Sequence, residues 1–198
     1  MSNVRLSFLG RAQFERDGQI VDLRIGKMQA LLAYLALAQQ PQPREHLIDL
    51  LWAESHADAA RKNLRNSLWR LRQQFGEALL VSHDDHLSLA ESVWTDVVAF
   101  ESGLALNVPN DPQAIENLRI TLALWRGPLL DGTKLIDAPD FELWLSGERS
   151  RLAHLYTGGA EQLLAIHQAN GDWAAVADIA QQTLAVENMH EPTHVVLM

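Results

Sequence analysis

Five positively charged side chains lie between residues 61 and 72, and no carboxylate interrupts them. They are Arg61, Lys62, Arg65, Arg70 and Arg72. A local cluster of this kind can neutralise the phosphates of nucleic acid, and it indicates binding better than the total charge does. The alternative interpretation is a solvated basic helix face, because surface helices rich in Arg are common.

The same segment has the periodicity of an amphipathic helix over residues 58–75. The apolar positions recur every three or four residues and predict one buried face, formed by Ala60, Leu64, Leu68, Leu71 and Phe75. The remaining arc carries Lys62, Arg65, Asn66, Trp69, Arg70 and Gln73. An Arg side chain can donate two hydrogen bonds to a guanine edge, and an Asn side chain can form a pair of hydrogen bonds with an adenine edge. This helix is therefore predicted to face DNA.

The elements around it predict a winged helix-turn-helix over residues 1–95. Residues 4–9, 12–16 and 20–23 alternate as strands, with a turn at Asp17-Gly18. Residues 26–39 and 44–52 have helical spacing, and residues 79–82 and 86–89 form a hairpin. A short helix, a turn and a basic helix make a helix-turn-helix, and the hairpin that follows makes it winged.

Residues 96–198 show only helical patterns. Helices are expected near 101–106, 115–125, 141–170 and 173–186, with a bend near Gly158-Gly159 in the third. The two helices joined by Gly171-Asp172 carry a stripe of small residues, Ala174, Ala177, Ala180 and Ala185. With Pro192 about twenty residues further on, this pair looks like a tetratricopeptide unit. Such a unit buries its face only against neighbours, so we expect a fragment or an incomplete last helix. The predicted fold class is an α+β winged helix-turn-helix followed by an all-α tetratricopeptide-like domain.

The charge is distributed unevenly between these halves. The formal net charge is −9; residues 1–100 hold 11 Lys or Arg and 12 Asp or Glu, whereas residues 101–198 hold 5 and 13. The acidic half suits a protein-facing surface better than a DNA-facing one. The chain has no cysteine, which excludes disulfide scaffolds and thiol catalysis, and its longest apolar run, residues 30–38, is too short to cross a membrane. We expect a soluble cytoplasmic protein.

Several motifs, in this order, resemble one family of transcription factors. In the first half they are residues 31–37 (LLAYLAL), 44–47 (REHL), 50–52 (LLW), 63–65 (NLR) and 71–72 (LR). In the second half they are Asp96-Val97 with Phe100, residues 124–130 (LWRGPLL), and Trp144-Leu145 with Glu148-Arg149. The chain resembles the Streptomyces antibiotic regulatory protein type over nearly its whole length. The resemblance implies a response-regulator-type winged helix joined to a bacterial transcriptional activation domain.

The resemblance also implies roles for individual residues. It places helix 58–75 in the major groove, with Arg65, Asn66, Trp69 and Arg70 near base edges or sugar-phosphate, and Lys62 and Arg72 near phosphates. Gln73 lies on the same arc, whereas Arg61 lies near the helix start, away from the bases. Trp69 packs either on a thymine methyl or sugar, or in the core beside the wing, and burial of a large aromatic favours the core.

The start of the second helix and the turn of the hairpin lie near the predicted helix-turn-helix. Arg44 opens the second helix, where its guanidinium and the free N–H groups can meet a phosphate. The turn of the wing reads His83, Asp84, Asp85 and His86. Two carboxylates beside phosphates would repel, so the wing either stays off the DNA or contacts another subunit.

No catalytic, metal or cofactor site is predicted. Residues 190–194 (HEPTH) match the zinc-protease pattern, but Pro192 is incompatible with the continuous helix that this site requires. We expect a sequence-specific regulator, an activator that binds promoter repeats as a homodimer and contacts RNA polymerase, with further C-terminal regions in a longer parent chain. The alternative is an interaction module of a larger signalling protein, in which the winged helix is structural.

Overall fold

The computed structural model describes residues 3–38, 40–105 and 111–186. The chain opens with a mixed sheet in the order β3-β2-β1-β7, from β1 (Val4–Ser7), β2 (Gln13–Arg16), β3 (Gln19–Ile20) and β7 (Trp94–Thr95). β1 and β2 are antiparallel, and the Asp17-Gly18 turn that follows β2 has positive φ at both residues, as a tight hairpin requires. β7 adds to β1 in parallel, which the sequence did not indicate.

Three helices and a second sheet complete the first half. They are α1 (Gly26–Ala38), α2 (Arg44–Trp52) and α3 (Ala57–Phe75), then a short 3-10 turn at Glu77–Leu79. The hairpin of β5 (Leu80–His83) and β6 (His86–Leu89) follows as expected. β4 (Gln42–Pro43), in the segment between the first two helices, pairs with the free edge of β6.

In the described residues of the second half the regular elements are helices, and a non-helical segment over 123–138 joins the second of them to the third. The helices are α4 (Asp96–Ala105), α5 (Pro112–Leu122), α6 (Pro139–Ala169) and α7 (Trp173–Val186). α6 is one uninterrupted helix, and Gly159 lies directly against Leu104 and Leu122 of the neighbouring helices. The predicted fold class, an α+β first half followed by a helical half, is confirmed. None of the helices described here is both long and apolar enough to cross a membrane.

Trp173 and most of the alanine stripe of α7 are exposed. Trp173 is 65% exposed at the start of α7. Of the four alanines in the expected small-residue stripe, Ala180 is buried and the other three are exposed. α7 instead packs on α6 through Val176, Ala180 and Thr183.

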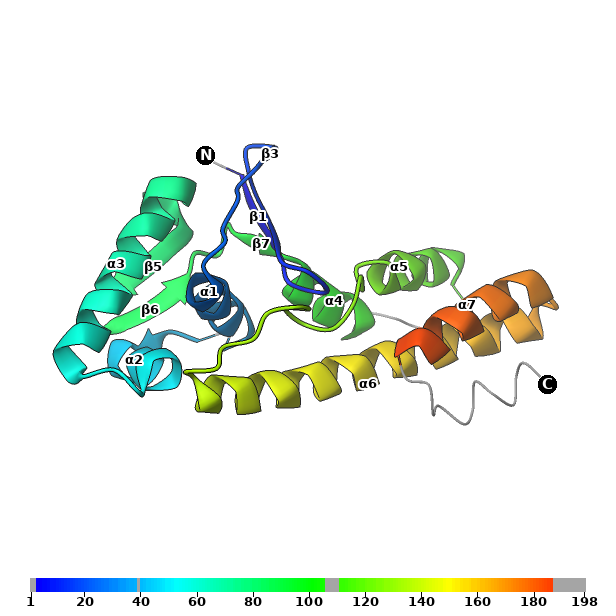
Figure 1. The fold of residues 1–198 in the computed structure, drawn as a ribbon. Coiled ribbons are helices and arrows are strands. Elements are labelled where there is room, and N and C mark those ends of the chain that lie inside the picture. The colour runs from blue at the N-terminus through cyan, green and yellow to red at the C-terminus, as the bar shows by residue number, and fades with distance from the viewer. Residues whose placement is uncertain (1–2, 39, 106–110, 187–198) are drawn as a thin grey trace.

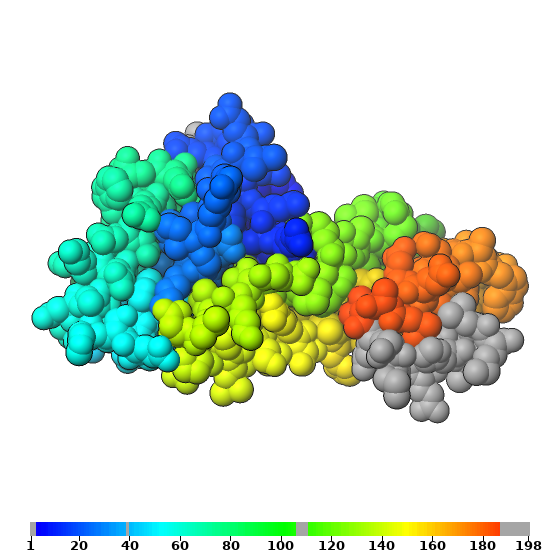
Figure 2. Space-filling model, viewed as in Figure 1, coloured from blue at the N-terminus to red at the C-terminus, as the bar shows by residue number. Residues whose placement is uncertain are grey.

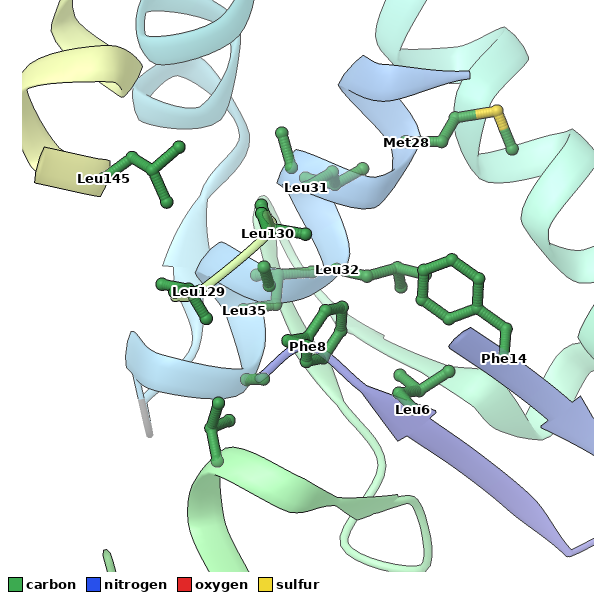
Figure 3. Packing of buried hydrophobic residues seen from close by; sticks show 14 of the residues in the cluster. Leu6, Phe8, Phe14, Met28, Leu31, Leu32, Leu35, Leu129, Leu130 and Leu145 are labelled. Atoms are coloured by element: carbon green, nitrogen blue, oxygen red, sulfur yellow. The ribbon is translucent and has the colours of Figure 1, made fainter. Parts of the chain in front are cut away.

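One continuous core joins the two halves. Figure 3 shows Leu6 and Phe8 beside Leu32 of α1, with Leu129 and Leu130 from the segment before α6 on the other side. The backbone is joined there too, because Leu130 N–H donates to Phe8 O at 2.9 Å and Gly10 N–H donates to Pro128 O at 3.0 Å. The helical half is therefore packed into the first half rather than tethered to it.

Asp96 is the polar centre of this junction. Its carboxylate is 2% exposed, accepts the N–H groups of Phe8 at 2.7 Å and Leu9 at 2.9 Å, and pairs with Arg126 at 3.3 Å. Burial raises the pKa of Asp96, against the opposing effect of the two backbone hydrogen bonds and Arg126. A single side chain thus ties the first strand, α4 and the segment before α6 together.

α6 also contacts the helix-turn-helix. Figure 1 shows it running from beneath α2 to the far end of the molecule, where α7 packs on it. The Trp144 ring lies 4.9 Å from that of Tyr34 on α1, and Lys27 pairs with Asp137 just before α6 at 2.6 Å. At 1.5 Å per residue, this helix is a rod of about 46 Å.

Candidate nucleic-acid interface

α3 forms an outer edge of the molecule. In Figures 1 and 2 it lies at the opposite end from α5 and α7, with one side open to solvent. Its inner side carries the predicted apolar residues, and the structure buries all five: Ala60, Leu64, Leu68, Leu71 and Phe75. The helix is held against the first half by this face, which leaves the opposite face free.

The outer face of α3 is built from four residues at helical spacing. Lys62, Asn66, Trp69 and Gln73 are separated by four, three and four positions, so they form one stripe along the helix, and all are exposed. Arg65 lies on one flank of this stripe and Arg70 on the other. We call these six residues the outer face of α3. It presents three cations, two amides and one indole.

The three cations of the outer face have no carboxylate partner. Lys62, Arg65 and Arg70 form no ion pair with any residue that the structure describes, and α3 carries no acidic residue after Asp58. A positive surface without internal compensation is the electrostatic arrangement that phosphate binding needs.

Arg61 and Arg72, also on α3, are held by acidic neighbours. Arg61 lies 3.2 Å from Glu45 of α2 and 3.8 Å from Asp58. Arg72 lies 3.3 Å from Glu77 and donates to the Ser82 hydroxyl at 3.1 Å. These guanidiniums brace α3 against α2 and the hairpin, so contact with a phosphate would require them to exchange partners.

Arg44 is held in the same way at the start of α2. Its guanidinium lies 4.0 Å from the Asp85 carboxylate, and its backbone N–H donates to the Asp85 carbonyl at 2.8 Å. The backbone donor that we expected to be open to a phosphate is therefore occupied by the hairpin. The guanidinium is partly exposed beside it.

Trp69 is exposed, and the expectation that it closes the core is wrong. Its side chain is 63% exposed. The reason lies in the helix register, because Leu68 and Leu71 occupy the buried positions and Trp69 is turned about 100° away from Leu68. The helical periodicity of the sequence places Trp69 on the exposed arc. At this position the periodicity is a better guide than the general tendency of aromatic side chains to be buried.

The turn of the β5–β6 hairpin presents the acidic residues seen in the sequence. His83, Asp84, Asp85 and His86 are all exposed, and Asp84 has a positive φ of 50°. Asp84 lies 3.2 Å from the His83 ring, whereas Asp85 faces Arg44. One of the two carboxylates thus already has a cationic partner at the start of α2.

The described residues contain no cluster of three or more His, Cys, Asp or Glu side chains that could hold a metal ion. The 190–194 segment, which matched the zinc-protease pattern, lies outside the described residues. Asp137 is paired with Lys27, which lowers the pKa of its carboxyl.

Comparisons with known proteins relate the chain to transcription regulators. Residues 95–198 match the family model of the bacterial transcriptional activator domain. The fold is similar to that of EmbR from Mycobacterium tuberculosis, solved in complex with a low-affinity phosphopeptide, with a TM-score of 0.71 and 22% identity. The alignment covers 100% of this chain and 54% of the EmbR chain, so this chain spans about half the length of that protein. No curated protein matches the sequence significantly.

Proposed function

Because this chain belongs to the bacterial transcriptional activator domain family, we propose that it is a sequence-specific DNA-binding regulator that activates transcription. In this proposal the outer face of α3 enters the major groove of promoter DNA. The acidic helical half contacts RNA polymerase or another protein. Residues 1–95 act as the DNA-binding unit and residues 96–198 as the activating unit.

The observation that carries the proposal is the outer face of α3 itself. It combines three cations without carboxylate partners, Lys62, Arg65 and Arg70, with two amides at a spacing that puts them on one stripe. An α-helix with its side chains is about 10–12 Å wide, and the major groove is about 12 Å wide. Arg65 and Arg70 can contact guanine edges or phosphates, while Asn66 and Gln73 can each pair with an adenine.

The remaining candidates act at the edges of this contact. Lys62 is placed to meet a phosphate, and Arg44, Arg61 and Arg72 can do so after leaving Asp85, Glu45 and Glu77. Their present ion pairs already order these side chains in the free protein. Less side-chain conformational entropy is therefore lost when DNA binds. They also reduce the attraction for DNA of any sequence, which favours selectivity.

The helical half is suited to a protein partner. It holds far fewer basic than acidic residues, and a surface of that charge is repelled by phosphate. α6 lies against α2, so a partner bound near the far end of α6 would be held at a fixed position relative to the DNA. Binding of two copies to adjacent promoter repeats, in the cytoplasm, completes the proposal.

The test is selection of bound duplexes from a random library, with wild type and the Arg65→Ala/Arg70→Ala variant. The wild type is expected to recover one motif, and the variant is expected to bind it about 30-fold or more weakly, since each good base contact contributes about 1–3 kcal/mol. A matched control is Arg24→Ala/Arg119→Ala, which removes the same charge from exposed positions outside α3. This control should retain the motif and most of the affinity.

Failure to recover a motif, together with no binding at low salt, would contradict the proposal. The helical half would then be the functional part, as in the alternative of an interaction module. Equal loss of affinity in the variant and its control would also contradict it, because binding would then follow total charge rather than the outer face of α3.

A further inference from the structure

Trp69 is a large apolar side chain in the middle of a polar surface. Its indole is 63% exposed, between Asn66 one turn before it and Gln73 one turn after it. In the described part of the chain it stacks on no aromatic ring and has no cation over its face. An apolar group of this size gains free energy when a partner removes it from water.

The neighbours of Trp69 determine what kind of partner can cover it. Lys62, Arg65 and Arg70 share the outer face with the indole, and no described carboxylate compensates their positive charge. An apolar protein surface would have to bury these cations without partners, which is costly. DNA provides phosphates for the cations and an apolar group for the indole, the thymine C5-methyl in the major groove.

The amides on either side favour the same base pair. Asn66 and Gln73 are the side-chain types that make paired hydrogen bonds to adenine, and each A·T pair presents the adenine edge and the thymine methyl in the same groove. The alkyl stems of the amide and cationic side chains offer less apolar surface than an indole does. Among the residues of the outer face, Trp69 is therefore the best suited to cover a methyl group.

We propose that Trp69 is a specificity-determining residue that reads a thymine methyl group in the major groove. The inference rests on the proposed function and makes it more specific. The DNA site contains at least one A·T pair opposite the middle of α3, with its thymine methyl packed on the indole. Uracil at this position, which pairs identically but lacks the methyl, is discriminated against.

The experiment replaces each thymine of the selected duplex, one at a time, by deoxyuridine. At one or two adjacent positions the wild type is expected to lose about fourfold in affinity, which is the effect of burying one methyl-sized group. Trp69→Ala should bind the unmodified duplex more weakly and be insensitive to deoxyuridine at those positions. Trp69→Phe keeps an apolar ring and should keep the sensitivity.

Trp173→Ala is the matched control. Trp173 is 65% exposed, nearly as much as Trp69, but it lies on α7 at the other end of the molecule (Figure 1). Its loss should change neither the affinity nor the response to deoxyuridine. Because both tryptophans are exposed, neither substitution should affect folding, and unfolding in urea checks this directly.

The inference and the function proposed above fail in different ways. If the wild type binds its selected site but no thymine shows a methyl effect, the inference about Trp69 is wrong and DNA recognition stands. The same conclusion follows if Trp69→Ala retains the full methyl effect. If the wild type selects no site, both proposals are wrong, and Trp69 then belongs to a protein-binding surface.

Discussion

At the scale of single residues, the partners of a side chain distinguish cations of the same type. Arg65 and Arg70 form no ion pair with a described carboxylate, whereas Arg61 and Arg72, on the same helix, are paired with Glu45 and Glu77. The sequence could identify the basic cluster but could not divide it, because the acidic partners come from other elements. Arg44 shows this most clearly, since Asp85 lies far from it in sequence but 4.0 Å away in space.

Neutralising Asp85 should therefore strengthen DNA binding. Asp85→Asn removes a negative charge beside the proposed DNA-binding surface and releases Arg44, so we expect a several-fold higher affinity and a salt dependence steeper by about one phosphate contact. The measurement is a salt titration of binding to the selected duplex. Asp84→Asn is the control, because it removes the same charge from a residue that pairs with His83 instead. An equal gain in both variants would show that Arg44 plays no part.

At the scale of elements, the structure agrees with the prediction where the spacing of apolar residues within one segment determines its secondary structure. The helix expected over 58–75 spans Ala57–Phe75 in the structure, and its buried face is the predicted one. β4 and β7 were missed, because each is two residues long and exists only through a distant partner, β6 or β1. Trp69 was assigned to the core from residue type when its place in the period indicated exposure.

The contact between α4 and α5 depends on a glycine whose role is clear only in the structure. A Cβ on Gly103 would fall onto the Thr121 hydroxyl and lie 2.8 Å from its Cγ2, while the same atom on Gly147 of α6 would meet open space. Gly103→Ala is expected to destabilise the fold by about 1–3 kcal/mol through overpacking. Gly147→Ala is expected to stabilise it by up to about 1 kcal/mol, since Ala is the better helix former. Urea unfolding of both variants measures these two changes. Equal changes in the free energy of unfolding would contradict the close contact between Gly103 and Thr121.

At the scale of the whole molecule, the two halves share one core, and Asp96 lies where they meet. The sequence predicts two domains with a boundary near residue 95, and the matched activator region begins there as well. The core continues across this boundary, from Leu6 and Phe8 to Leu129 and Leu145, and α6 lies on α2. Such an arrangement fixes the position of α3 relative to the helical half without a flexible linker.

Asp96 gives this junction a defined pH dependence. Burial raises its pKa, so the folded chain binds this proton more tightly than the unfolded chain does. Its contribution to stability is therefore complete below the unfolded pKa of about 4 and falls as the pH rises through the raised value. Asp96→Asn cannot titrate at this position. The unfolding free energy of the wild type, measured relative to that of this variant, should therefore decrease as the pH rises from 4 to 7. A constant difference would contradict the raised pKa.

Removal of the Asp96 side chain tests the junction itself. Asp96→Ala leaves two buried N–H groups, of Phe8 and Leu9, without their acceptor, and Arg126 without its carboxylate. We expect a loss of about 1–3 kcal/mol in the free energy of unfolding. Urea unfolding should show one cooperative transition in wild type, because the core is continuous. Two separate transitions in wild type would contradict a shared core.

The most direct test of the central claim, that the outer face of α3 reads DNA in the major groove, is methylation interference on the selected duplex. Guanine N7 faces the major groove and adenine N3 faces the minor groove. Methyl groups on guanine N7 within the motif should block wild-type binding. Methyl groups on adenine N3 should not, since the acidic hairpin has no Lys or Arg at its turn to place in the minor groove. Interference at adenine N3 alone, or at neither position, would contradict recognition in the major groove by α3.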